Sequence, residues 1–140
     1  MYTQALFTNK PKGGKNMSTS CECECGAAPK LIFSCSGAAD VGAISDLTAR
    51  KMSKAGVGKM FCLAGIGGRV SGIIKTTEVA SKILAIDGCP LDCAKNSLEN
   101  AGFKEFEHIR VTDCGFEKGG TEVNEENVAK VVDKASKLLE

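Results

Sequence analysis

The sequence has no excess of charge of either sign. Its 18 Lys and Arg residues are matched by 17 Asp and Glu residues, which leaves a formal net charge of +1. A protein that binds nucleic acid or an anionic membrane surface usually carries a strong positive excess on one face. The composition therefore gives no support to nucleic acid or a membrane as the partner of this protein.

The sequence also lacks long apolar segments. It has no uncharged stretch of about 18 residues, the length that a membrane-spanning helix needs. The first 30 residues contain no apolar run of the kind found in a signal peptide. These absences predict a soluble, cytoplasmic protein.

Nucleotide-binding motifs and histidine are scarce as well. The glycine-rich segment 62–69 reads CLAGIGGR and matches neither the P-loop pattern nor G-x-G-x-x-G. Its amides could hold an anion or donate to thiolates, but close backbone packing is the better explanation of the glycines. His108 is the only histidine. Because it opens a predicted strand, away from the edge where ligands bind, a Cys-His catalytic pair has little support and we interpret His108 as structural.

Cysteine, in contrast, is abundant, with eight residues in a chain of 140. Cysteines form disulfides in an oxidising compartment, whereas in a reducing one they serve as thiolates for metal or redox chemistry. The chain shows no export signal and is long enough to form one domain with a hydrophobic core. We therefore expect thiolates rather than disulfides.

The chain divides into two parts. Residues 1–30 are rich in Lys, Gly, Ser, Thr and Pro without periodicity, which predicts a flexible N-terminal tail that carries the motif CECEC at 21–25. Over residues 31–140, short apolar runs alternate with helix-like segments, and this alternation predicts a single α/β domain.

The expected strands cover 31–35, 59–64, 82–87 and 108–113, and the expected helices cover 40–55, 90–101 and a segment starting near Asn124, with a short crossover helix within 66–82. Four strands joined by such crossovers imply a parallel sheet with helices on both faces, as in Rossmann-like and flavodoxin-like folds. The common doubly wound order 2-1-3-4 is our prediction. Pro90 suits the first position of its helix, and Asn124 suits an N-cap.

Cysteines follow the predicted strands at the points where the strands end. Cys35, Cys62 and Cys89 end or follow the first three strands, and Cys114 follows the fourth. The carboxyl ends of parallel strands share one edge of the sheet, where ligands bind. Neighbouring strands lie about 4.8 Å apart, and thiolates around a tetrahedral zinc lie about 3.8 Å from one another. Three adjacent strand ends can therefore meet one ion, while Cys114 stands one strand farther away and is either a neighbour of the site or a buried thiol.

The segment 86–95, IDGCPLDCAK, brings a fourth cysteine to the same edge. With Pro90 as the first helical residue, Cys89 is the N-cap and Cys93 lies one turn later, so both sulfurs can face one point. The helix dipole would lower both pKa values and favour thiolates. We interpret Asp87 as a hydrogen-bond partner of the following turn, with support of a bound metal as the alternative.

Several uses of these cysteines stay open. Four thiolates can hold zinc or an iron-sulfur cluster, and a thiol or persulfide redox enzyme would use Cys89 or Cys93 as its nucleophile. The C-x3-C spacing, however, is not the C-x-x-C of thioredoxin-like sites. Four bound thiolates leave no open position for water, so we expect a non-hydrolytic protein that binds zinc in a structural, metal-handling or sensing role. Buried, unligated thiols are the plain alternative.

The tail motif CECEC is a separate object. In an extended chain Cys21, Cys23 and Cys25 project to one side, so they could capture a soft metal ion or reach the main site. Incidental thiols in a disordered tail are an equally good interpretation.

Four motifs, FSCSGAADVGAISDLTAR, CLAGIGG, IDGCPLDCAK and GFEKGGT, resemble the DGC-domain family, which is named for the Asp-Gly-Cys found here at 87–89. The resemblance covers about residues 31–127. It implies a zinc-binding protein in which the family's four characteristic cysteines, proposed to hold one ion, are Cys35, Cys62, Cys89 and Cys93. Cys114 and CECEC have no counterpart in the family pattern. Because the activity of the family is poorly defined, the resemblance indicates the site and leaves the protein partner open.

Overall fold

The computed structural model describes residues 27–140. Its elements follow one another as β1 (Lys30–Ser34), α1 (Asp40–Lys54), β2 (Lys59–Met60), α2 (Leu63–Gly67), α3 (Ser71–Glu78), β3 (Lys82–Asp87), α4 (Cys93–Ala101), β4 (Glu107–Arg110), a 3-10 turn (Thr112–Cys114) and α5 (Glu125–Leu138). The predicted tail and its CECEC motif lie outside the described residues, apart from the few residues that lead into β1.

The sheet has the predicted parallel topology, with the order β2-β1-β3-β4. β1 and β3 form its centre, where Leu31 pairs with Ile83 and Phe33 with Ala85. Both central strands are almost completely buried, as expected for parallel strands covered on both faces. The carboxyl ends of all four strands consequently point to one edge of the sheet.

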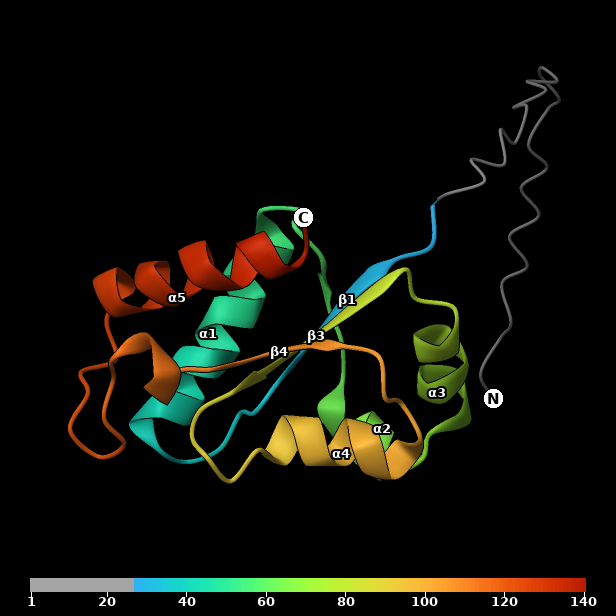
Figure 1. Ribbon diagram of the computed structural model, residues 1–140, viewed down its shortest axis with the longest axis horizontal. Coiled ribbons are helices and arrows are strands. Elements are labelled where there is room, and N and C mark those ends of the chain that lie inside the picture. The colour runs from blue at the N-terminus through green and yellow to red at the C-terminus, as the bar shows by residue number, and fades with distance from the viewer. Residues whose placement is uncertain (1–26) are drawn as a thin grey trace, which may run out of the picture.

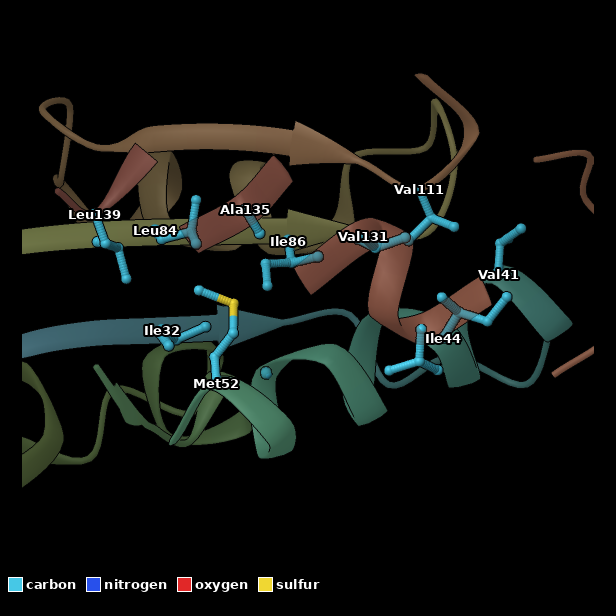
Figure 2. Packing of buried hydrophobic residues seen from close by; sticks show 12 residues of the cluster. Ile32, Val41, Ile44, Met52, Leu84, Ile86, Val111, Val131, Ala135 and Leu139 are labelled. Atoms are coloured by element: carbon cyan, nitrogen blue, oxygen red, sulfur yellow. The ribbon is translucent and has the colours of Figure 1, made fainter. Parts of the chain in front are cut away.

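Helices cover both faces of this sheet (Figure 1). α1 and α5 lie on one side, and α2, α3 and α4 lie on the other. Because side chains alternate along a strand, Ile32 of β1 packs in the layer of α1 and α5, while its neighbours Leu31 and Phe33 pack in the opposite layer. Figure 2 shows the first of these layers, with Met52 of α1 beside Ile32. This packing holds the helices in place on both faces, so that the starts of α1, α2 and α4 lie near the carboxyl edge of the sheet.

Two predicted elements between residues 59 and 82 differ from those observed. The predicted strand 59–64 ends at Met60, and α2 begins at Leu63 instead. The crossover contains two short helices, α2 and α3. A Cβ at Gly65 would lie 2.8 Å from Cγ1 of Ile73 on α3, so close packing explains this glycine, as the sequence suggested.

The start of α4 also differs from the prediction. The helix begins at Cys93, not at Pro90, and the amide of Asp92 donates to the carbonyl of Cys89 (3.1 Å), which closes a tight turn over 89–92. Asp92 itself adopts a left-handed conformation, with φ of 52°. Pro90 is therefore the second residue of a turn, a position that requires nearly the same φ as the first residue of a helix.

The C-terminal part of the domain follows the prediction more closely. The side chain of Asn124 caps α5 by accepting a hydrogen bond from the amide of Asn127 (2.9 Å). The predicted strand 108–113 is divided between β4 and the 3-10 turn that ends at Cys114. Within residues 27–140, none of the helices has the length and apolar character needed to cross a membrane.

Candidate functional site

The four cysteines of the predicted metal site all lie at the carboxyl edge of the sheet. Cys35 directly follows β1, and its amide donates to the carbonyl of Ile86 (2.9 Å), which extends the pairing of β1 with β3. Cys62 precedes α2 as its N-cap residue, Cys89 lies in the turn after β3, and Cys93 is the first residue of α4. Cys62 and Cys93 are exposed, whereas Cys35 and Cys89 are half-buried. These cysteines come from the ends of three adjacent strands, β2, β1 and β3.

The Cys93 thiol lies close enough to two other cysteines to be affected by them. Burial raises the pKa of the Cys93 thiol, and the neighbouring Cys35 thiol, the Asp87 carboxylate and the Cys89 thiol raise it further. The prediction that the helix dipole lowers the pKa of Cys93 is therefore wrong for the metal-free protein, because partial burial and nearby negative groups outweigh the dipole. A cation beside these sulfurs would reverse the effect and favour the thiolates.

The thiols are not drawn together in the geometry of a bound zinc. In the part of the chain that the structure describes, one group of three residues has its possible ligand atoms within 4.8 Å of one another. This group consists of Asp87, Asp92 and His108, and it contains no cysteine. No three cysteine sulfurs between residues 27 and 140 meet the same condition. Their donor chemistry suits zinc, but ligation of one ion by all four stays a prediction.

Asp87 holds the start of α4 from the end of β3. Its buried carboxylate accepts hydrogen bonds from the amides of Ala94 (2.7 Å) and Lys95 (3.0 Å), and Nε2 of His108 donates to it (3.0 Å). Asp87 was interpreted as a hydrogen-bond partner of the turn that follows it, but its carboxylate bonds beyond that turn, to the first residues of α4. Since these amides are the orphan donors of a helix N-terminus, Asp87 takes the role that the side chain of an N-cap residue usually has.

His108 and Arg110 connect β4 to the cysteine-bearing turn. Arg110 donates from Nε (2.5 Å) and Nη2 (2.6 Å) to the two carboxylate oxygens of Asp92. Nε2 of His108 lies 3.7 Å from Oδ1 of Asp92. The hydrogen bonds from Arg110 hold the pKa of Asp92 below its usual value. The oxygens of Asp87 and Asp92 are thus already engaged, which makes this group a structural network rather than an open metal site.

This network was not predicted from the sequence. His108 was interpreted as structural, which its hydrogen bond to Asp87 supports, but it was placed away from the site, and Arg110 was not considered. The available signal was their spacing, because residues two apart on a strand share one face. Their partners Asp87 and Asp92 lie 21 and 18 residues away in the sequence, so the pairing itself was not visible there.

Comparison with known proteins identifies the family of the chain. Residues 31–135 match the model of the DGC domain. The chain belongs to the DGC-domain family. It is 32% identical over 88 residues to the anaerobic and virulence modulator AnvM of Pseudomonas aeruginosa, an alignment that covers 63% of this chain and 67% of AnvM. No solved structure matches the chain.

The glycine of the DGC motif has a packing reason. A Cβ at Gly88 would lie 2.8 Å from the amide nitrogen of Gly42 and 2.9 Å from the carbonyl carbon of Val41, at the start of α1. Gly42 in turn faces the carbonyl oxygen of Gly37, which a Cβ would approach to 2.6 Å. The cysteine-bearing loop after β1, the first turn of α1 and the DGC turn are therefore stacked backbone on backbone.

A second DGC-domain motif, GFEKGGT, is fixed to the same end of α1. The carboxylate of Asp40 accepts hydrogen bonds from the amides of Gly119 (2.9 and 3.0 Å) and Thr121 (2.8 Å), and also from Val41 (2.8 Å). These amides, Gly119 first, hold the pKa of Asp40 below its usual value. The motif therefore places a loop over the start of α1 and contributes no metal ligand that we identify.

Cys114 is a half-buried thiol that packs as a hydrophobic side chain. It packs against the hydrophobic layer of α1 and α5, and its sulfur lies 3.5 Å from the carbonyl oxygen of Arg110. Burial is the main cause that raises the pKa of this thiol. Cys114 is not among the groups that shift the pKa of Cys93, which favours the buried-thiol alternative over a place in the site.

Proposed function

We propose that this DGC-domain protein binds one zinc ion through the thiolates of Cys35, Cys62, Cys89 and Cys93. The observation that carries the proposal is the convergence of these four soft donors, from separate parts of the chain, at one edge of a parallel sheet. The electrostatic influence of Cys35 and Cys89 on Cys93 supports it further. Four cysteine thiolates are a common ligand set of structural zinc sites.

Binding requires the sulfurs to move closer together. Around a tetrahedral ion the sulfurs would lie about 3.8 Å from one another. Among the cysteines of residues 27–140, no three sulfurs all lie within 4.8 Å of one another. Three of the four residues lie in loops between a strand and a helix, where rotation of the side chains can bring the sulfurs closer together. The network of Asp87 and Asp92 meanwhile holds the segment that carries Cys89 and Cys93.

The roles that fit this coordination are a structural one, metal handling or sensing, rather than catalysis. A zinc ion with four thiolate ligands has no position left for water or substrate, so it cannot activate a nucleophile. The name of the relative AnvM describes it as an anaerobic and virulence modulator. We extend this only to the proposal that metal occupancy controls the state of the carboxyl edge in the present protein.

Elemental analysis of the full chain, purified without oxygen, tests the zinc site. We expect one zinc per chain, and a loss of most of it when Cys35, Cys62, Cys89 or Cys93 is changed singly to serine. Cys114→Ser is the matched control and should retain the metal, as should a variant with serine at positions 21, 23 and 25. Unchanged zinc content in all four single variants would refute the site, and an absorption spectrum with the bands of an iron-sulfur cluster would replace zinc by that cofactor.

A thiol enzyme is the second candidate function, because Cys93 is exposed at the first residue of a helix. Alkylation by iodoacetamide, followed by mass spectrometry, separates the two functions. If Cys93 reacts rapidly in both the as-isolated and the chelator-treated protein, the thiol-enzyme function is favoured. If it is protected until zinc is removed, the metal-binding function is favoured.

A further inference from the structure

A cavity of about 630 Å³ opens beside Cys62 at the carboxyl edge of the sheet. α1, the end of β1, the segment from β2 to α2, and α4 surround it. Its apolar wall is formed by Met60, Phe61, Leu63 and Ala64. The volume falls within the range of sites that bind small molecules. Nothing in the four-thiolate proposal requires such a space.

Ser34, the last residue of β1, is one of the residues that line this cavity. It is only 3% exposed, and its Oγ makes no hydrogen bond to any residue from 27 to 140. Because buried polar atoms of native proteins almost always have a partner, this hydroxyl is an unused polar group beside the cavity. The hydroxyl can both donate and accept.

Arg50 supplies unused donors at the same cavity. Its Nε donates to Oδ2 of Asp46 (2.6 Å) and its Nη2 to Oδ1 (3.3 Å), while Ser36 donates to the same Oδ1 (2.7 Å). A guanidinium has five N–H donors, and these two bonds are the ones it makes within the described chain. The carboxylate of Asp46 is thus well satisfied, whereas the outer edge of the guanidinium is free to bind an anion.

Two lysines add positive charge around the cavity. Nζ of Lys59 lies 5.9 Å from the centre of the Phe61 ring, which forms part of the wall. Lys54 lines an adjoining hollow together with Arg50 and Met60. Only Asp46 opposes these cations among the residues that line the two hollows, so the local charge favours an anionic ligand over a cationic one.

We propose that this cavity binds a small organic carboxylate with an apolar body. One oxygen of the carboxylate pairs with the outer edge of Arg50, the body packs on Met60, Phe61 and Leu63, and the other oxygen meets the hydroxyl of Ser34 once that side chain turns toward the cavity. The inference is independent of the zinc proposal, since it rests on residues other than the four cysteines. Because Cys62 is also part of the wall, a bound carboxylate covers this exposed thiol.

Titration with 4-phenylbutyrate and with its neutral amide, 4-phenylbutyramide, tests the proposal. Amide chemical shifts of the isotope-labelled full chain report binding and its location. We expect saturable shifts around Ser34, Phe61 and Leu63, and an affinity for the carboxylate roughly tenfold above that for the amide. In chelator-treated samples, where bound metal does not protect Cys62, the carboxylate should slow alkylation of this thiol by iodoacetamide, and the amide should slow it less.

Two variants and one control complete the experiment. Arg50→Gln should weaken carboxylate binding roughly tenfold, while Lys75→Gln removes an equal charge from exposed α3 and should leave it unchanged. Ser34→Ala should weaken both probes but not lower the melting temperature, because no hydrogen bond is lost in the free protein. Equal affinity for carboxylate and amide, equal losses in both charge variants, or no saturation at millimolar concentrations would overturn the proposal. Zinc content, measured on the same samples, shows separately whether the metal proposal fails.

Discussion

At the scale of single residues, the site depends on side chains that are small or absent as much as on those that bind. Gly88 lies directly against the backbone of Gly42 and Val41, so its hydrogen atom is what lets the DGC turn approach α1. The sequence made the motif visible, but a glycine in a motif can serve a turn, a ligand or a contact. The distances in the structure assign it to a contact.

We predict that Gly88→Ala lowers the free energy of unfolding by about 1–3 kcal/mol, because the new Cβ overlaps main-chain atoms that cannot rotate away. Gly72→Ala is the control: a Cβ there meets nothing within 4 Å in helix α3, so stability should rise by about 0.5–1 kcal/mol. Urea unfolding followed by circular dichroism measures both. Equal stability of the Gly88 variant and the parent chain would contradict the close contact.

The ion pair of Asp92 and Arg110 predicts a dependence of stability on pH. The folded-state pKa of Asp92 lies below its ordinary value, first because of the hydrogen bonds from Arg110. The unfolded chain therefore binds more protons near that pH, so the contribution is complete above the unfolded pKa of about 3.9 and is lost as pH falls through the folded pKa.

Urea unfolding between pH 7 and pH 3 should accordingly show a gap between parent chain and Asp92→Asn that narrows as the pH falls. Asp133→Asn, at an exposed position of α5, should run parallel to the parent chain. A gap for Asp92→Asn that stays constant over this range would show that the carboxylate charge is not what Arg110 stabilises.

At the scale of elements, Pro90 explains why the start of α4 was predicted three residues too early. A φ near −65° serves both the first residue of a helix and the second residue of a turn, so Pro90 is compatible with either. The carboxylate of Asp87 selects the turn, because it accepts hydrogen bonds from the amides of Ala94 and Lys95. These bonds place the start of the helix after the turn. This contact depends on how β3 packs beside α4, which local sequence patterns do not contain.

The N-cap of α5 was predicted correctly, because it depends on neighbouring residues only. Asn124→Ala should cost about 1 kcal/mol of stability, since the amide of Asn127 loses its acceptor. Asn124→Asp keeps an acceptor and should change stability by less than about 0.5 kcal/mol. Thermal or urea unfolding compares the two variants, and equal losses would contradict the capping role.

Asp40 links helix α1 to the loop over 115–121, so its removal should free the loop and leave the sheet intact. In Asp40→Asn we expect several-fold faster hydrogen exchange at the amides of Gly119 and Thr121, because a neutral amide oxygen accepts more weakly than a carboxylate. Amides of β3 serve as the internal reference. Unchanged exchange at both loop amides would show that the loop is held by other contacts.

At the scale of the whole molecule, the sequence predicted the fold well. The order and direction of the strands are confirmed, because four short strands separated by crossovers long enough for helices leave few topologies for the chain. The same reasoning placed Cys35, Cys62 and Cys89 at one edge, where the structure has them. It could not give the distances between their sulfurs, which depend on side-chain rotation and on the position of α2, nor the pairing of β4 with the cysteine-bearing turn.

The arrangement of the molecule presents two candidate ligand sets at the same edge. One contains the four cysteine thiols, and the other contains Asp87, Asp92 and His108, whose ligand atoms lie within 4.8 Å of one another. The hydrogen bonds that already engage the second set favour the first. The first set offers sulfur atoms to a bound ion and the second offers oxygen and nitrogen atoms, so the two sets can be distinguished by the atoms that surround the ion.

X-ray absorption at the zinc edge is the most direct test of the proposal that Cys35, Cys62, Cys89 and Cys93 hold the zinc ion. It would be measured on the full chain loaded with one equivalent of zinc and carrying serine at positions 21, 23 and 25, so that the tail supplies no sulfur. We expect four sulfur neighbours at about 2.3 Å from the zinc. A first shell of oxygen and nitrogen at about 2.0–2.2 Å would contradict it and would assign the ion to Asp87, Asp92 and His108 instead.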